Sequence, residues 1–179
     1  GKGEPDFRDR LAAWASWADG HRGDLSADAA RRIADEARRI MRAAGYKRRV
    51  PSGTDINREL AGKLILMAYP DRAARRATPR GSHAPRWVLA TGRSARATGS
   101  LAKEEFLAVA ELDGGETEAR ILSGAPITSG ELKHGLTCRA TIKKITEWDG
   151  WEPRIYSRRV YEHIILEEKI GEFPPPNEL

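Results

Sequence analysis

The sequence predicts an α+β protein, in which a helical N-terminal segment precedes a small antiparallel β-barrel. Up to about residue 70, apolar residues recur every three or four positions, which is the period of helices that pack on one face. After about residue 85 they occur in short runs between glycine-containing turns, which is typical of strands. The order of strands, a short helix and more strands best matches an OB-like barrel. We therefore predict a helical segment at 1–70, a basic linker at 71–84, an OB-like barrel at 85–170 and a disordered tail at 171–179.

The helical segment contains start and stop signals for two helices. Asp6 is placed to cap a first helix, which Asp19 and Gly20 end. Ser26 is placed to cap a second helix, and Gly45 supplies its stop. Each helix has an apolar face, formed by Phe7, Leu11 and Trp14 in the first and by Ile33, Ala37, Ile40, Met41 and Ala44 in the second.

A third helix is expected after Thr54 or Asp55, either of which can cap it. It contains Ile56, Leu60 and the run 64–67, which is apolar on almost every side, so we expect this helix to be buried on most sides. Pro70 should end it, because proline cannot continue the hydrogen-bond ladder of a helix.

The second half of the chain contains strand and turn signals. Asp113-Gly114-Gly115 and Asp149-Gly150 are hairpin turn sequences. A short helix is expected from Thr128, with Ser129 as its cap, and the prolines 174–176 cannot pair in a sheet. Strands are expected at 86–89, 106–109, 119–122, 138–145, 154–161 and 164–166.

Composition limits the class of protein. Hydrophobic residues make up 40 % of the 179 residues, enough for a modest core. Cys138 is the only cysteine, which excludes a disulfide framework and a multi-cysteine zinc site; it is expected to be a small buried residue. No apolar run is long enough to span a membrane and no leader opens the chain, which predicts a cytoplasmic location. The start at Gly1, without methionine, indicates an excised fragment or a cleaved tag.

Motifs for catalysis are missing, so the chain is predicted to be neither an ATPase nor another enzyme and to hold no cofactor or metal. Gly62-Lys63 lies in an apolar helix without the hydroxyl residue of a phosphate loop, and no Asp-Glu-x-His box is present. His21, His83 and the other two histidines lack the spacing of metal ligands. A triad assembled from distant residues stays open as an alternative.

The arginines carry the functional signal. The net charge is +5, and residues 71–100 contain seven arginines but one acid, Asp71. Guanidinium groups suit phosphate oxygens, whereas a solvated basic surface is the alternative. Trp87 and Phe106 are expected in the core, while tryptophans beside the 149–150 turn are better placed to stack on bases. The candidate nucleic-acid-binding residues are Arg72, Arg75, Arg76, Arg86, Arg93, Arg96, Trp148 and Trp151.

Several stretches resemble HrpB-type DExH helicases between about residues 61 and 168. The most specific is an apolar helix that ends in Ala-Tyr-Pro-Asp-Arg at 68–72. Thr91 and Ser94 depart from the asparagine and glycine of the family pattern, so a turn there is expected to differ. The other similar stretches are Arg86–Ala95, Phe106–Asp113, Ala119–Ile121, Ala125–Ile127, Trp148–Asp149, Arg158–Arg159 and Leu166–Glu168.

The resemblance implies the end of a helicase-associated helical domain, then an OB-like barrel and the start of the HrpB-specific C-terminal region. It implies a non-catalytic accessory role, with ATP and magnesium bound by RecA-like motor domains outside these residues. The implied partners are those motor domains and single-stranded nucleic acid, RNA in preference to DNA, with no membrane. A stand-alone basic nucleic-acid-binding or protein-interaction module is the alternative.

Overall fold

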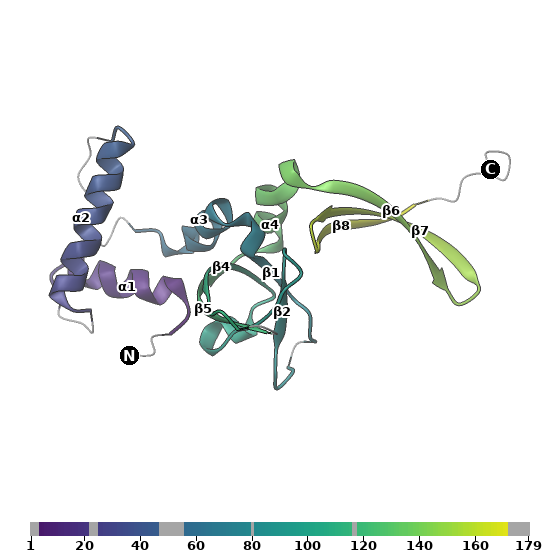
Figure 1. The fold of residues 1–179 in the computed structure, drawn as a ribbon, viewed down its shortest axis with the longest axis horizontal. Coiled ribbons are helices and arrows are strands. Elements are labelled where there is room, and N and C mark those ends of the chain that lie inside the picture. The colour runs from purple at the N-terminus through teal and green to yellow at the C-terminus, as the bar shows by residue number, and fades with distance from the viewer. Residues whose placement is uncertain (1–3, 22–24, 47–55, 80, 116–117, 172–179) are drawn as a thin grey trace. The chain divides into compact units, whose positions relative to one another are not determined.

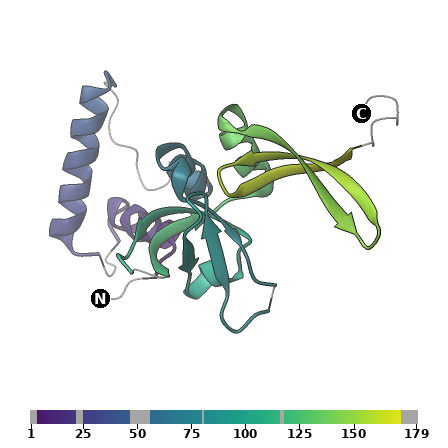
Figure 2. The same cartoon turned by 45° about the vertical axis from the view of Figure 1, so that its right-hand side comes forward.

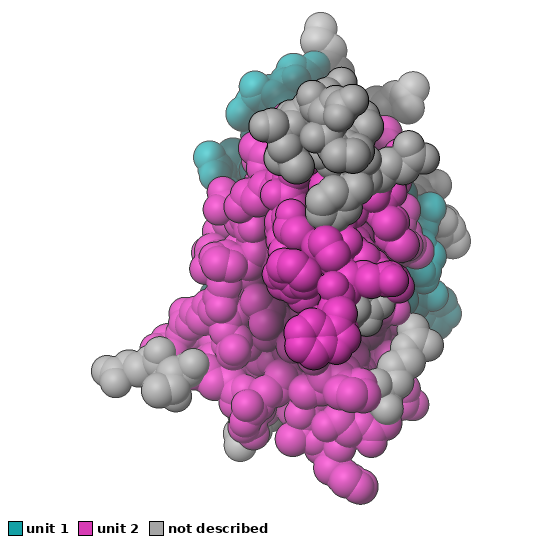
Figure 3. All heavy atoms as spheres, turned by 90° about the vertical axis from the view of Figure 1, so that its right-hand side faces the viewer, with its two compact units in different colours: residues 1–61 teal, residues 62–179 magenta. Residues whose placement is uncertain are grey.

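The computed structural model describes residues 4–21, 25–46, 56–79, 81–115 and 118–171. The chain forms two compact units, residues 1–61 and residues 62–179, which Figure 3 distinguishes by colour. The first unit is helical, and the second contains a closed barrel and a separate three-stranded sheet (Figures 1 and 2). The order of helices followed by strands confirms the predicted α+β class.

The first unit contains helices α1, Phe7–Ala18, and α2, Ala27–Ala43, followed by the 3-10 turn η2, Arg58–Leu60. Both predicted caps are confirmed, because the Asp6 carboxylate accepts from the backbone N–H of Arg8 and the Ser26 hydroxyl from that of Ala29. Gly45 has a φ of 79°, the left-handed conformation expected of a residue that ends a helix.

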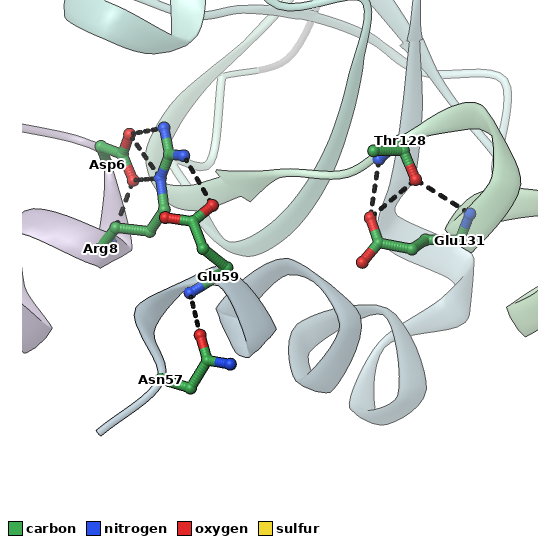
Figure 4. Close-up of polar contacts among 6 residues, drawn as sticks. All are labelled: Asp6, Arg8, Asn57, Glu59, Thr128 and Glu131. Atoms are coloured by element: carbon green, nitrogen blue, oxygen red, sulfur yellow. Dashed lines mark hydrogen bonds and ion pairs between the residues drawn. The ribbon is translucent and has the colours of Figure 1, made fainter. Parts of the chain in front are cut away.

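A polar cluster ties the start of α1 to η2 within this unit (Figure 4). The Arg8 guanidinium donates to both carboxylate oxygens of Asp6, which is 2 % exposed. Arg8 also lies 3.6 Å from the Glu59 carboxylate, and the Asn57 side chain accepts from the Glu59 N–H at 3.1 Å. Burial of Asp6 is therefore compensated by the paired charge of Arg8 and by the backbone N–H of the same residue.

The third helix starts later than predicted. Helix α3 is Ala61–Ala68, and the predicted caps Thr54 and Asp55 lie outside the described residues. It ends before Pro70, as predicted, and Pro70 begins the 3-10 turn η3, Pro70–Arg72. Burial on most sides was wrong: Ile65 and Leu66 are buried, but Leu64 and Met67 are 61 % and 66 % exposed.

The barrel comprises five strands in the closed order β1-β2-β3-β5-β4. Strands β3 and β5 run parallel and the other neighbours antiparallel, so the barrel is mixed rather than wholly antiparallel. A 3-10 turn, η4, Gly99–Lys103, connects β3 to β4. The strands are β1 Ala73–Arg76, β2 Arg86–Leu89, β3 Ser94–Arg96, β4 Phe106–Leu112 and β5 Ala119–Pro126. Five strands closed in this way fit the predicted OB-like fold.

The barrel begins and ends earlier than predicted. Strand β1 lies within the predicted linker 71–84 and closes the barrel by pairing with both β2 and β4. Only Ala73 and Ala74 of this strand are buried, so its apolar signal in the sequence is weak. Residues 141–170, predicted as part of the barrel, belong to a separate sheet.

That sheet has the order β6-β7-β8, with β6 Thr141–Asp149, β7 Glu152–Tyr161 and β8 Ile164–Gly171. Helix α4, Ser129–Leu136, precedes it and is capped by Thr128 rather than by Ser129, in a reciprocal capping box with Glu131 (Figure 4). Cys138 was predicted to be buried in a strand, but it is exposed in the 3-10 turn η5, Thr137–Arg139. The predicted tail lies outside the described residues, apart from Gly171.

One outer side of the barrel is covered. Ala73, Ala108 and Ala125 form a row across β1, β4 and β5, and all three are fully buried although they point away from the core. Gly62 of α3 lies against the backbone of Pro126 at the end of β5, and Leu66 of α3 packs on α4. Small residues in these positions allow the helices to approach the sheet closely. The outer side of β2 and β3 carries Arg86, Val88, Ser94 and Arg96 instead.

Candidate nucleic-acid interface

Three arginines lie side by side on three neighbouring strands, away from the covered row of alanines. Arg86 on β2 is the direct partner of Arg96 on β3, and Arg96 is the direct partner of Arg120 on β5. The preceding or following residues, Trp87, Ala95 and Ala119, belong to the barrel core. Because side chains alternate between the faces of a strand, Arg86, Arg96 and Arg120 project outward together. We call these three residues the arginine row.

Glu118 is the counterion of this row. Its carboxylate pairs with the Nε of Arg86 at 3.1 Å and also with the Nε of Arg96. The Glu118 side chain is 21 % exposed, whereas those of Arg86 and Arg96 are 54 % and 49 % exposed. Like charges directly opposite each other on a sheet repel, so the carboxylate stabilises a cluster that would otherwise be unfavourable. The row with Glu118 still has a net charge of +2, from three arginines and one acid.

Arg75 extends the same outer surface. It is exposed on β1, opposite Val88 of β2 and Phe106 of β4. Arg76, which follows Arg75, faces the inside of the barrel opposite Trp87. Leu107, which follows Phe106, is in the core. Arg75 and Phe106 therefore face outward. Phe106 lies on the outer surface and is only half-buried, so its predicted place in the core was wrong, whereas that of Trp87 is confirmed.

Arg76, the neighbour of Arg75, is part of the barrel structure. Its guanidinium donates to the carbonyl of Ala102 at 2.7 Å and to that of Thr78 at 3.2 Å. It lies 5.1 Å from the centre of the Trp87 ring, which is fully buried. Arg76 thus closes one end of the barrel with charge-assisted hydrogen bonds and a cation–π contact.

Two other predicted arginines also bind backbone carbonyls. Arg72 donates to the carbonyl of Ala110 at 2.7 Å and lies 4.8 Å from the centre of the Tyr69 ring. Arg93, in the turn between β2 and β3, donates to the carbonyl of Gly115 in the loop between β4 and β5. A contact of Arg72, Arg76 or Arg93 with nucleic acid stays a prediction.

The loop before β5 is held beside the arginine row by Asp113. Its Oδ1 accepts from the backbone N–H of Arg120 at 2.6 Å and from that of Gly115 at 3.3 Å. The hydrogen bond from Arg120 is the main cause that lowers the pKa of Asp113, and the nearby charges of Arg93 and Arg120 contribute. The ionised carboxylate therefore fixes the start of β5, which carries Arg120.

The two candidate tryptophans belong to the other sheet. Trp148 and Trp151 flank the turn between β6 and β7, and their exposed fractions of 71 % and 97 % confirm the predicted exposure. The barrel is contacted by the opposite end of β7, where the N–H of His163 donates to the carbonyl of Ala90. Ten residues of β7 separate these two ends, or about 30 Å at the rise of an extended strand. The tryptophans are therefore not part of the arginine row, and their stacking role stays a prediction.

No group of three histidine, cysteine or acidic side chains in the described ranges is arranged to hold a metal ion. No helix within them combines the length and the apolar character required to cross a bilayer.

The fold of this chain is similar to part of solved helicase structures. No protein-family model matches the sequence, and no curated protein matches it. The crystal structure of the E. coli DExH-box NTPase HrpB is similar, with a TM-score of 0.62 and 19 % identity over 96 % of this chain. The chain has the fold of a part of HrpB. A second structure, of the Escherichia coli DEAH/RHA helicase HrpB, gives a TM-score of 0.57 and 15 % identity over 96 % of this chain.

This chain spans 22 % of the length of either HrpB structure. The likeness confirms the fold that the motif at 68–72 and the later stretches implied, a helical segment followed by an OB-like barrel. At 19 % and 15 % identity, this likeness shows the fold alone.

Sequence reasoning missed Glu118 and Arg120. Arg120 lies outside the arginine-rich stretch, between the apolar residues Ala119 and Ile121. A charged residue between two apolar ones is typical of a strand with one buried face, and this pattern indicates that Arg120 points outward. Its position beside Arg96 depends on the parallel pairing of β3 and β5, which are far apart in the sequence.

Proposed function

We propose that this chain is a non-catalytic accessory region of an ATP-dependent helicase of the HrpB type and that it binds single-stranded nucleic acid. The observation that carries the proposal is the arginine row on the uncovered outer side of β2, β3 and β5. In OB-folds the face of the second and third strands, with the adjoining loops, is the surface that binds oligonucleotides. The likeness to HrpB supports the same role.

The chemistry of the row suits a phosphate backbone. Three neighbouring strands place Arg86, Arg96 and Arg120 across about 10 Å, at the usual strand spacing of about 4.8 Å. Guanidinium groups bind phosphate oxygens in a fork, and arginine cannot lose its charge at physiological pH. Arg75 adds a further cation, and the half-buried ring of Phe106 beside it offers a stacking surface for a base.

The parent protein would supply the chemical step. We place ATP and magnesium in RecA-like motor domains outside this chain, which are its proposed partners, and assign no hydrolysis to residues 1–179. RNA is the proposed strand in preference to DNA, and the cytoplasm the proposed location. The absence of a phosphate-loop motif from the sequence supports the assignment of ATP to other domains.

Titration of labelled single-stranded RNA and DNA oligonucleotides at several salt concentrations tests the interface. Three phosphate contacts predict a log–log salt slope of about −2, at about 0.7 per contact on a single strand. The variant R86Q/R96Q/R120Q should bind at least about tenfold more weakly and lose most of that slope. A control variant, R31Q/R38Q/R39Q, removes the same charge from α2, where each arginine already pairs with an acid three residues before it.

The outcomes separate the alternatives. Equal weakening by the two triple variants would show that net charge alone attracts the strand and would contradict the interface. Unchanged binding by R86Q/R96Q/R120Q would move the protein-interaction alternative ahead. Tighter binding to DNA than to RNA would overturn the strand preference alone. ATP turnover by the purified chain, with or without RNA, would overturn the non-catalytic role.

A further inference from the structure

The outer edge of strand β6 is long and free in the described part of the chain. Over residues 141–149, β6 pairs with β7 alone, from Thr141 opposite Val160 to Asp149 opposite Glu152, without a register shift. Every second backbone N–H and C=O group of such a strand points outward. An edge of this kind is a template for pairing with another strand.

The opposite edge of the sheet is different. Strand β8 has an irregular register beside β7, between Arg159 and Val160. The side chain of Lys133 on α4 reaches Glu167 of β8 at 3.1 Å, so the helix adjoins that strand. Bulges and neighbouring helices protect sheet edges, and β6 has neither a proline nor a bulge.

Strand β6 also exposes large apolar side chains. Ile142 and Trp148 are 64 % and 71 % exposed, and their even spacing puts them on the same face. They lie three residues before and three residues after Ile145, which is therefore the centre of a symmetric pattern. Between them lie Lys143, Lys144, Thr146 and Glu147.

Two copies of β6 are complementary in one antiparallel register. When the strands cross at Ile145, Ile142 of each copy lies opposite Trp148 of the other. In the same register Lys143 lies opposite Glu147, and Lys144 lies opposite Thr146. Apolar and oppositely charged pairs directly opposite each other stabilise a sheet, and symmetry makes each of these pairs occur twice.

The adjacent registers that keep the faces matched are less favourable. Centring the pair on Lys144 or on Lys143 puts two lysines directly opposite each other, which is destabilising. Centring it on Thr146 pairs Lys143 with Asp149, but it puts Ile145 opposite Glu147 and loses the contact between Ile142 and Trp148. Lysine repulsion thus disfavours the registers centred on Lys144 and Lys143, and loss of the apolar pair disfavours the register centred on Thr146, which leaves the register centred on Ile145.

We propose that β6 is an interface between two copies of this chain. The two three-stranded sheets join edge to edge about a two-fold axis through Ile145 and form one continuous sheet. The contact is isologous, because each copy supplies the same residues to its partner. It involves no residue of the arginine row, and its test measures dimerisation in the absence of nucleic acid.

Sedimentation or light scattering over a wide range of protein concentration tests this interface. The parent chain should change from monomer toward dimer as its concentration rises. K143E puts Glu opposite Glu147, and E147K puts Lys opposite Lys143; each should weaken dimerisation by about tenfold or more, since attraction becomes repulsion at two symmetric positions. An equimolar mixture of the two variants restores both pairs and should dimerise as the parent does.

Controls separate the interface from a loss of fold. Glu147 also binds Arg158 at 2.7 Å, so circular dichroism of E147K must match the parent, and K143E and W148A provide the test if it does not. K103E makes the same charge change on an exposed residue of η4 and should leave dimerisation unchanged. W148A should weaken it, whereas W151A, which alters a residue outside the paired segment, should not.

A chain that stays monomeric at all concentrations would overturn the proposal. So would dimerisation that K143E and W148A leave unchanged, because the contact would then lie elsewhere. Weakening by K143E without restoration in a mixture of folded variants would also contradict it, since the pairing of Lys143 with Glu147 would not be the cause.

Discussion

Arg86 and Arg96 lie directly opposite each other on β2 and β3 and share one carboxylate, that of Glu118. Two cations at this separation repel, so the barrel folds with its own counterion in place. The same carboxylate would compete with a phosphate for the two guanidinium groups. Glu118 therefore links the stability of the barrel to the affinity of the proposed interface.

The variant E118Q should bind single-stranded nucleic acid more tightly and be slightly less stable. Removing the acid frees Arg86 and Arg96, so the salt slope should steepen by up to about 0.7 for each additional phosphate contact. The free energy of unfolding should fall by less than about 1 kcal/mol, because the three side chains are partly exposed and solvent screens their charges. Oligonucleotide titration and thermal melting measure the two effects.

Glu111 provides the matched control for this prediction. It is exposed on β4 and is not part of the arginine row. E111Q changes the net charge by the same amount and should alter binding much less than E118Q does. Equal effects would indicate that the overall charge, not the position of the carboxylate, controls affinity.

The adjacent residues Arg75 and Arg76 should give opposite results when each is changed to glutamine. R76Q removes charge-assisted bonds to the carbonyls of Ala102 and Thr78, which are worth about 1.5–3 kcal/mol for a charged donor, so the melting temperature should fall. R75Q removes an exposed side chain on the outer surface and should weaken binding with little change in stability. The reverse pattern in the two assays would contradict the assignment of Arg76 to structure and Arg75 to the surface.

The helices were the most predictable part of the fold. The caps Asp6 and Ser26 and the stop at Gly45 are local signals, and each works through hydrogen bonds or φ angles within a few residues. Strand β1 was missed because it buries two alanines between arginines, and its place is fixed by β2 and β4 rather than by its own sequence. Pairing between distant segments is a tertiary property.

The same distinction applies to the candidate site. A cluster of arginines at 72–96 is visible in the sequence, but the alternation and pairing of strands decide which of them share a face. Alternation puts Arg75 and Arg76 on opposite faces of β1, and the pairing of β3 with β5 places Arg120 beside Arg96. The tryptophans beside the 149–150 turn were expected to be exposed, and they are, but on a different sheet.

The lowered pKa of Asp113 predicts a pH dependence of stability. Because its folded pKa lies below the unfolded value, ionised Asp113 stabilises the protein above the unfolded pKa of about 3.9, and this contribution is lost as the pH falls through the folded pKa. D113N should be less stable than the parent at neutral pH, and the difference should shrink on acidification below about pH 4. Urea unfolding from neutral to acidic pH measures it; a constant difference would contradict the role of the carboxylate charge.

Gly62 tests how closely α3 approaches the barrel. A Cβ added at this position would overlap the carbonyl oxygen of Pro126 and lie 2.6 Å from Cγ2 of Ile127, and backbone cannot move aside as a flexible side chain can. G62A should therefore lower the free energy of unfolding by about 1–3 kcal/mol, even though alanine is the better helix former.

Gly130, in the first turn of α4, is the control for the intrinsic preference of alanine. The nearest atom to a Cβ there is the Thr128 hydroxyl oxygen at 3.9 Å, which is ordinary contact. G130A should leave stability unchanged or raise it by up to about 1 kcal/mol. If urea unfolding shows G62A to be as stable as G130A, close packing of α3 against the end of β5 does not contribute to stability, and the prediction for Gly62 is wrong.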